Sequence, residues 1–240
     1  MSEITTYHTG LLERSPNQLK EDVEYLSKFI NSDRIDRILE VLASRTRHVT
    51  VVLEDIHKAH NANAVLRSCE GFGVQDVHII ENNNRFESSS TISLGSHKWL
   101  SLYKYSRNES NVQECFQHLR QQDYTIIATS PHYNSREISD LEVDDKTALV
   151  FGTELDGVSD EVISQCDGFI KIPMVGFVES YNLSVSAAIC LHTLTAKLRK
   201  KPDRYWSLNE KEKLQLQVEW MLKSTKNGRR IWDKYLRENL

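Results

Sequence analysis

From Val49 onward, short runs of β-branched and aliphatic residues alternate with segments whose apolar residues recur every three or four positions. Runs of the first kind are typical of buried strands, and segments of the second kind are typical of helices. Strand and helix in alternation predict an α/β domain built on a mainly parallel sheet. Strands are expected at residues 49–53, 77–80, 125–129, 148–151 and 169–172, and helices at 61–71, 111–122, 160–166 and 182–200.

Both ends of the chain show helical patterns of their own. Ser15 followed by proline, with Gln18 three residues after the serine, predicts a capping box at a helix start. A second helix is expected to begin near Asn31 with Leu39 facing inward, and residues 207–210 predict a further capping box. The chain is therefore expected to have three segments: a helical N-terminal extension (1–48), an α/β domain (49–200) and a basic helical C-terminal extension (201–240).

The composition is that of an ordinary globular protein, with 39% hydrophobic and 27% charged residues in 240. No basic stretch followed by an apolar run opens the sequence, and no uninterrupted apolar segment approaches the roughly 18 residues of a membrane span. We therefore expect a cytoplasmic protein. The four cysteines form no C-x-x-C pair and the histidines no H-x-x-x-H spacing, so no metal site is expected.

Charge is distributed unevenly along the chain. The formal net charge is −4, yet residues 197–240 hold thirteen lysines and arginines against six aspartates and glutamates, which leaves −11 for the rest. A basic terminal segment of this kind indicates contact with a polyanion such as RNA. A solvated helix face without a partner explains the same charges equally well.

Polar residues gather where three of the predicted strands end, which is where open α/β sheets bind ligands. In the first cluster, Asn61 stands at the expected cap of a helix. Arg67 projects away from the apolar face that Val65 and Leu66 form on that helix. An arginine beside free helix N–H groups can hold a phosphate, although a surface salt bridge is its commoner use.

Glycines mark the second cluster, in which Gly152 and Gly157 flank Glu154 between a strand and a helix. Such glycines permit a tight loop close to a ligand, and a plain strand–turn–helix connection is the alternative. The G-x-G-x-x-G fingerprint, the G-x-x-x-x-G-K-[ST] phosphate loop and the G-x-S-x-G nucleophile motif are all missing. A dinucleotide site is therefore disfavoured.

The third cluster leads from an isoleucine-proline-methionine run to Ser180 and Asn182, which precede a helix rich in small residues. The N–H groups at that helix start can bind an anionic oxygen. Capping of the helix by these side chains is the alternative.

In order and spacing, the three clusters resemble the three motifs of the SpoU/TrmH family of SPOUT methyltransferases. The first motif has an asparagine and, six residues later, an arginine; the second has glycine-x-glutamate before a further glycine; the third runs from isoleucine-proline-methionine to serine-x-asparagine. The matching positions are Asn61 and Arg67, then Gly152, Glu154 and Gly157, then Ile172, Met174, Ser180 and Asn182. The likeness extends over about residues 37–200, including residues 56–58 and 95–99.

The resemblance implies a methyltransferase that uses S-adenosylmethionine and whose sheet ends in a deep trefoil knot. General connection rules would not predict such a knot, because knots are nearly absent from proteins. The catalytic surface implied by the resemblance comprises Asn61, Arg67, Glu154, Ser180 and Asn182. The implied cofactor pocket is lined by Thr129, Gly152, Ile172, Met174, Tyr181 and Leu183.

The same resemblance implies methylation of a ribose 2′-hydroxyl in tRNA, with guanosine 18 of the D-loop as the expected target. It also implies a homodimer whose site lies near the subunit interface. Methylation of ribosomal RNA, or a non-catalytic RNA-binding protein of the same fold, are the alternatives. RNA contacts are expected from Arg45, Arg47, His60, Lys200, Arg229 and Arg230.

Two further features of the site bear on its chemistry. Glu179 and Tyr181 replace the glutamine and leucine common in the family, which adds a negative charge and an aromatic ring near the pocket. In the family, Arg67 would be the residue that activates the hydroxyl. Because a guanidinium is a poor base, we favour a grip on the neighbouring RNA phosphate.

Overall fold

A computed structural model describes residues 3–4, 10–86, 95–106 and 110–238. The described chain divides into two compact units. Residues 46–206 and the short strand β1 (Glu3–Ile4) form one, here called the α/β unit. Residues 10–45 and 207–238 form the other, called the helical unit, so both ends of the chain contribute to it.

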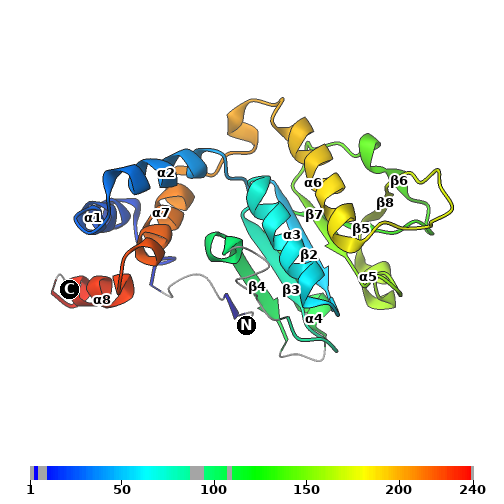
Figure 1. Ribbon diagram of the computed structural model, residues 1–240, viewed down its shortest axis with the longest axis horizontal. Helices are drawn as coiled ribbons and strands as arrows, with labels where there is room; N and C mark the ends of the chain where they lie inside the picture. The colour runs from blue at the N-terminus through cyan, green and yellow to red at the C-terminus, as the bar shows by residue number, and fades with distance from the viewer. Residues whose placement is uncertain (1–2, 5–9, 87–94, 107–109, 239–240) are drawn as a thin grey trace. The chain divides into compact units, whose positions relative to one another are not determined.

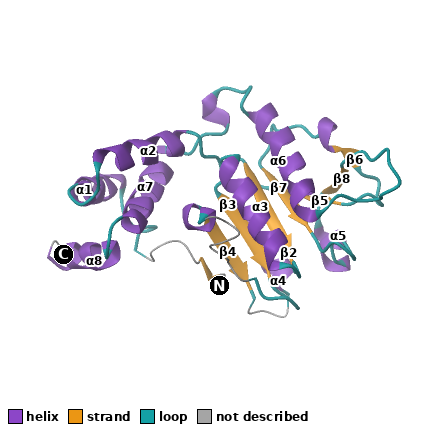
Figure 2. Ribbon diagram, viewed as in Figure 1, coloured by secondary structure: helices purple, strands orange, loops and turns teal. Residues whose placement is uncertain are grey.

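The α/β unit is built on one sheet whose order is β1-β4-β3-β2-β7-β5-β8-β6 (Figures 1 and 2). Every neighbouring pair is parallel except the antiparallel pair of β1 with β4. The central strand β2 pairs Val51 with Val77 on one side and with Leu149 on the other. The strands are β2 (Val49–Glu54), β3 (Asp76–Ile80), β4 (Ser101–Tyr105), β5 (Thr125–Thr129), β6 (Arg136–Glu137), β7 (Thr147–Phe151) and β8 (Gly168–Lys171).

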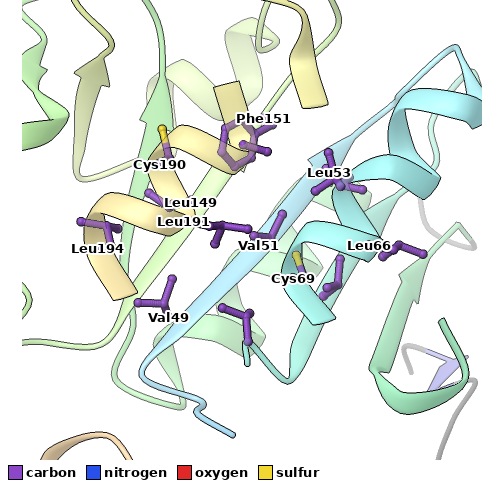
Figure 3. Close-up of a cluster of buried hydrophobic side chains, with 14 of the residues drawn as sticks. Val49, Val51, Leu53, Leu66, Cys69, Leu149, Phe151, Cys190, Leu191 and Leu194 are labelled. Carbon is purple, nitrogen blue, oxygen red and sulfur yellow. The ribbon is translucent and has the colours of Figure 1, made fainter. Parts of the chain in front are cut away.

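Helices cover both faces of the sheet, because successive side chains of a strand point to opposite faces and both sets are apolar here. On β2, Val49, Val51 and Leu53 belong to the core beneath α3 (Ala59–Gly71) and α6 (Leu183–Leu198), while Val52 belongs to the core of the opposite face. Figure 3 shows the first of these cores, with side chains from both helices against the strands. The opposite face packs against α4 (Asn111–Arg120) and α5 (Asp160–Gln165).

The helical unit contains α1 (Pro16–Ser27), α2 (Ser32–Ala43), α7 (Glu210–Ser224) and α8 (Gly228–Glu238). Its core is completed from both termini, because α1 packs on α7 and the amide of Gln215 donates to the carbonyl of Leu11 at 3.2 Å. The carboxylate of Asp22, fully buried on α1, forms an ion pair with Arg14 at 2.5 Å. Among the described residues there are also three short 3₁₀ turns, all in the α/β unit: Ser96–Trp99, Ile138–Asp140 and Asp203–Tyr205.

The predicted α/β class is confirmed, with all five predicted strands present within one residue at each end. The capping box of Ser15 with Gln18 and the start at Asn31 are also confirmed. Several details were wrong. The last capping box is formed by Asn209 with Glu212, and Leu39 is 46% exposed. Strands β4 and β6 and helix α8 were not predicted at all.

None of the helices that the structure describes is both long and apolar enough to cross a membrane.

Candidate active site

The strand order reverses at the centre of the sheet. The chain runs outward from β2 through β3 to β4, then crosses to the other side of β2 and forms β5. Strand β7 later pairs between β2 and β5, and β8 lies beyond β5. Open α/β sheets bind ligands at the carboxyl ends of strands beside such a reversal. A cavity of about 390 Å³ is found there, lined by the segments that follow β5, β7 and β8 and by the start of α6.

Glu154 joins the three sequence motifs in space. Its Oε1 accepts hydrogen bonds from the amide of Asn61 at 2.7 Å and from the amide of Asn182 at 2.6 Å. Its Oε2 accepts from the ammonium of Lys58 at 2.7 Å. The Asn182 amide also reaches Oδ1 of Asn61 at 3.3 Å. These four residues, here called the motif cluster, come from the segments after β2, β7 and β8.

Hydrogen bonding and charge both favour the ionised form of Glu154. The hydrogen bond from Lys58 is the main reason that the pKa of Glu154 is lowered, and the Asn61 amide and the N–H of Leu183 act in the same direction. Partial desolvation opposes them. Glu154 is therefore a fixed carboxylate acceptor at the cavity wall, not an acid that carries a proton at neutral pH.

The loop that carries Glu154 is tight for a structural reason. A Cβ at residue 152 would lie 2.0 Å from the carbonyl oxygen of Gly157, so only glycine fits there. Gly157 itself has φ +71°, in the left-handed region, and its N–H and carbonyl bond Thr153. From the sequence, these glycines were expected to leave room for a ligand. In the structure, the space at Gly152 is filled by the backbone of its own loop.

Two residues at the end of β2 support the site and were not singled out from the sequence. Buried Glu54 accepts from the backbone N–H of Ser159 at 2.9 Å and from its hydroxyl at 2.5 Å, and burial raises the pKa of this carboxyl. Asp55, at φ 53°, accepts the backbone N–H groups of Asn82, Asn83 and Asn84. The available signal was a pair of acidic residues directly after an apolar strand, a position where a charge needs partners.

The structure brings the predicted cofactor residues together. All six of them line the cavity: Thr129, Gly152, Ile172, Met174, Tyr181 and Leu183. Glu154, Ser180 and the departing residue Glu179 line it as well. Cys190 forms part of the wall, and burial raises the pKa of its thiol to about 12, so it is a neutral packing group and not a nucleophile.

Arg67 is placed apart from this cavity. It is exposed on α3 and does not line the cavity, and no hydrogen bond or ion pair within the described chain holds its guanidinium. At 100° per residue, it lies about 240° around the helix from Asn61. Asn61 is not the helix cap that the sequence predicted, because α3 begins at Ala59 and Asn61 is buried in its first turn.

Two of the predicted RNA contacts are corrected by burial. Arg45 is 1% exposed, and its guanidinium lies 5.1 Å from the ring centre of Trp220. Arg47 is mostly covered and pairs with buried Asp76 at 2.9 Å. Both cations therefore have structural partners inside the protein. The other four predicted contacts are exposed: His60, Lys200, Arg229 and Arg230.

Comparison with known proteins identifies the class to which this fold and cavity belong. A model of the SpoU rRNA methylase family matches residues 48–192, and the chain belongs to this family. Membership implies the trefoil knot that the motifs predicted. A solved structure, the TrmH/SpoU tRNA modifying enzyme of A. aeolicus, covers 81% of this chain and 98% of its own with a TM-score of 0.72 at 28% identity.

Two relatives share more of the sequence. The chain is 41% identical over 202 residues to a tRNA (guanosine(18)-2'-O)-methyltransferase of Borreliella burgdorferi. The matched region covers 84% of this chain and 90% of the relative. It is 39% identical over 155 residues to the protein of the same name from Thermus thermophilus. That match covers 65% of this chain and 78% of the relative.

Proposed function

We propose that this protein transfers a methyl group from S-adenosylmethionine to the ribose 2′-hydroxyl of guanosine 18 in tRNA, in the cytoplasm. The observation that carries the proposal is the direct bonding of all three family motifs through Glu154, beside a cavity at the reversal of strand order. The names of the two relatives, at 41% and 39% identity, support guanosine 18 as the target.

The cavity suits this methyl donor in size and charge. Ligand pockets commonly measure about 300–1,000 Å³, and this one has about 390 Å³. Apolar walls from Ile172, Met174 and Leu183 suit a nucleoside and a thioether chain. Acidic groups at Asp156 and Glu179 complement a sulfonium and an ammonium. When bound, the cofactor would supply an electrophilic methyl group.

The chain's own residues would bind and orient the ribose. In our proposal, Ser180 and the motif cluster form the surface that receives the target nucleotide, and the fixed carboxylate of Glu154 keeps the Asn61 and Asn182 amides in one orientation. Arg67 grips an RNA phosphate with its planar fork and orients the hydroxyl, whose proton passes to that phosphate or to water. An arginine stays protonated in proteins, so it would not act as the base.

A homodimer is part of the proposal. Apolar side chains beside the cavity are highly exposed, among them Leu155 (95%), Val175 (104%) and Phe177 (108%), with Val178 and Val185 also exposed. Soluble proteins seldom leave such a patch uncovered. A second copy of the chain packed there would cover the patch. It would also provide a route for Arg67 of one subunit to serve a cavity that its own side chain does not line.

Division of labour between segments completes the proposal. The segment 49–200 carries the chemistry and some of the RNA contacts, and the extensions 1–48 and 201–240 add further RNA affinity. Exposed Arg229 and Arg230 on α8 and exposed His60 and Lys200 are the proposed phosphate contacts. Phosphate contacts dominate the affinity of RNA-binding proteins and make it dependent on salt.

The decisive experiment is ribose-methylation mapping by mass spectrometry on unmodified tRNA transcripts incubated with S-adenosylmethionine. We expect one methylated ribose at guanosine 18, and no product when that nucleotide is a 2′-deoxyguanosine. Ribosomal RNA in the same assay tests the alternative substrate, which the description of the matching family favours. Methylation of ribosomal RNA alone would overturn the tRNA assignment, and cofactor binding without any methylation would overturn the enzyme.

A further inference from the structure

We infer that Lys58 is a positioning residue of the methyl-transfer site, which acts by fixing the carboxylate of Glu154 and through it the Asn61 and Asn182 amides. The inference rests on the proposed function, because it assigns Lys58 to the same site. It is carried by the 2.7 Å contact between the Lys58 ammonium and Oε2 of Glu154.

The contact is complementary to the other bonds of Glu154. Both asparagine amides donate to Oε1, at 2.7 and 2.6 Å, and Lys58 alone of the cluster donates to Oε2. A carboxylate free to rotate would offer Oε1 in many directions. With Oε2 held by a cation, Oε1 is directed at both amides together, and charge-assisted bonds of this kind are the stronger ones.

The segment that carries Lys58, residues 55–58, is held in place by hydrogen bonds to residues 82–84. Asp55 holds one end of residues 55–58 through its three bonds to the backbone of residues 82–84. The ring Nδ1 of His57 bonds Oδ1 of Asn84 at 2.8 Å, next to Lys58 itself. The backbone that presents Lys58 is therefore fixed on the neighbouring strand connection, which a lysine with no task beyond solubility does not require.

Stability does not explain the pair. The Lys58 side chain is 65% exposed and that of Glu154 is 23% exposed. Ion pairs this exposed contribute little to folding. Their effect on orientation at an active site can be large, since a displacement of about 1 Å can lower a rate by about 10²-fold.

Other charged groups near Glu154 do not take the place of Lys58. Those that line the cavity are His132 after β5, Asp156 in the same loop as Glu154, Asp160 on α5, Lys171 at the end of β8 and Glu179 before α6. Among the described residues, Lys58 is the charged group that forms an ion pair with Glu154. Its removal should therefore let Glu154 take up a proton at higher pH, and a neutral carboxyl is a weaker acceptor for the two amides than a carboxylate.

The test compares Lys58→Met with Lys58→Arg in single-turnover methylation of tRNA, with both substrates saturating, from pH 4 to pH 9. We expect Lys58→Met to lower the rate about 10–100-fold and to move the acid limb of the profile to higher pH. Lys58→Arg, which keeps the charge, should restore most of the rate and the wild-type limb. Melting temperature and S-adenosylmethionine affinity should stay close to wild type in both.

Arg120→Met is the matched control. It removes a cation and its ion pair with Asp167 in the same unit, and neither residue lines the cavity. Its rate should be near that of the wild type.

The possible results separate the inference from the proposed function. An active wild type with Lys58→Met within twofold of it, or with a loss that is equal at every pH, would overturn the role of Lys58 alone. A loss that appears only below saturating tRNA, with a flatter salt dependence of tRNA binding, would make Lys58 a phosphate contact and also overturn it. A wild type that methylates no RNA would overturn the proposed function, and the role of Lys58 with it.

Discussion

The α/β unit and the helical unit use their charged side chains in different ways. In the α/β unit, Glu154 bonds Lys58 and two asparagines, so the charges of Lys58 and Glu154 are already satisfied. In the helical unit, Arg229 and Arg230 are exposed on one turn of α8. The first arrangement fixes geometry, and the second leaves charge available to a polyanion.

Net charge follows the same division. Residues 6–45 and 207–240 hold fourteen lysines and arginines against twelve aspartates and glutamates, a net of +2, and the remainder of the chain has a net of −6. An RNA is thus attracted more by the helical unit than by the unit that holds the cavity. Chemistry and RNA affinity should therefore respond to different mutations.

Arg67 offers the largest effect and the sharpest test of that separation, since it is an exposed cation within the α/β unit. We expect Arg67→Ala to lower single-turnover methylation by about 10²-fold or more, because the phosphate grip that orients the hydroxyl is lost. The free energy of unfolding should change by no more than about 0.5 kcal/mol, as is usual for exposed sites. Arg67→Lys should also be badly impaired, because lysine lacks the planar fork.

The control for this prediction is Arg136→Ala, which removes an exposed arginine from β6 of the same unit. It should keep wild-type turnover. Near-normal turnover of Arg67→Ala itself would remove this arginine from the mechanism, whatever its effect on tRNA affinity.

Arg45 tests the opposite case, a cation of the helical unit that is not available to RNA. Its guanidinium is buried and lies 5.1 Å from the centre of the Trp220 ring. We expect Arg45→Ala to lower the free energy of unfolding by about 2–4 kcal/mol, through lost packing and a lost cation–π contact. Chemical denaturation measures this loss. In conditions where the variant is folded, the salt dependence of its tRNA binding should equal that of the wild type.

Arg45 also shows what the sequence could not reveal. The sequence does not distinguish an arginine exposed to solvent from one packed on an indole ring. Trp220, the ring that Arg45 contacts, lies 175 positions later in the chain. The charge of residues 197–240 does not describe one structural unit, because residues 197–206 belong to the α/β unit and acidic residues of α1 and α2 share the helical unit.

The sequence predicted the structure better where the residue pattern follows directly from burial. The five strands were predicted because a buried parallel strand must be apolar on both faces. Strand β4 was missed because its residues, Ser101–Tyr105, include a serine, a lysine and two tyrosines that find partners only in the folded chain. Motif spacing predicted Glu154 and Asn182 as site residues. Their hydrogen bonds to Asn61 depend on the order of β2, β7 and β8 in the sheet, which the sequence does not reveal.

Acid should destabilise the α/β unit through its buried histidine. Burial, with a smaller effect of His118, lowers the pKa of His78 to about 3, and its ring is stacked on that of Tyr103. The folded pKa lies below the unfolded value of 6.5, so the unfolded state binds the proton first. Stability should therefore fall by about 1.4 kcal/mol per pH unit as pH drops below 6.5.

His78→Gln tests this assignment. Denaturation at several pH values between 7 and 5 should show a slope reduced by about one proton in this variant. His118→Gln is the control, because His118 is half-buried and nearby Asp76 and Glu114 oppose the lowering of its pKa. A wild-type slope in His78→Gln would place the acid sensitivity elsewhere.

The smallest expected effect concerns the exposed cations of α8. Deleting the C-terminal segment would not test them, because α7 fills the core of the helical unit with Leu216, Val218 and Met221. The double substitution Arg229→Gln with Arg230→Gln removes only charge. Each phosphate contact contributes about 0.7–0.9 to the logarithmic salt slope of binding, so the slope should fall by about 1.4–1.8. Turnover at saturating tRNA and S-adenosylmethionine affinity should not change.

Arg37→Gln is the control for this prediction. It lies on α2 of the same unit, where Arg37 is paired with Glu40 at 2.6 Å, and it should leave the slope near wild type. An unchanged slope in the double variant would show that α8 does not meet the RNA backbone, and the affinity would then have to come from the α/β unit despite its net charge of −6.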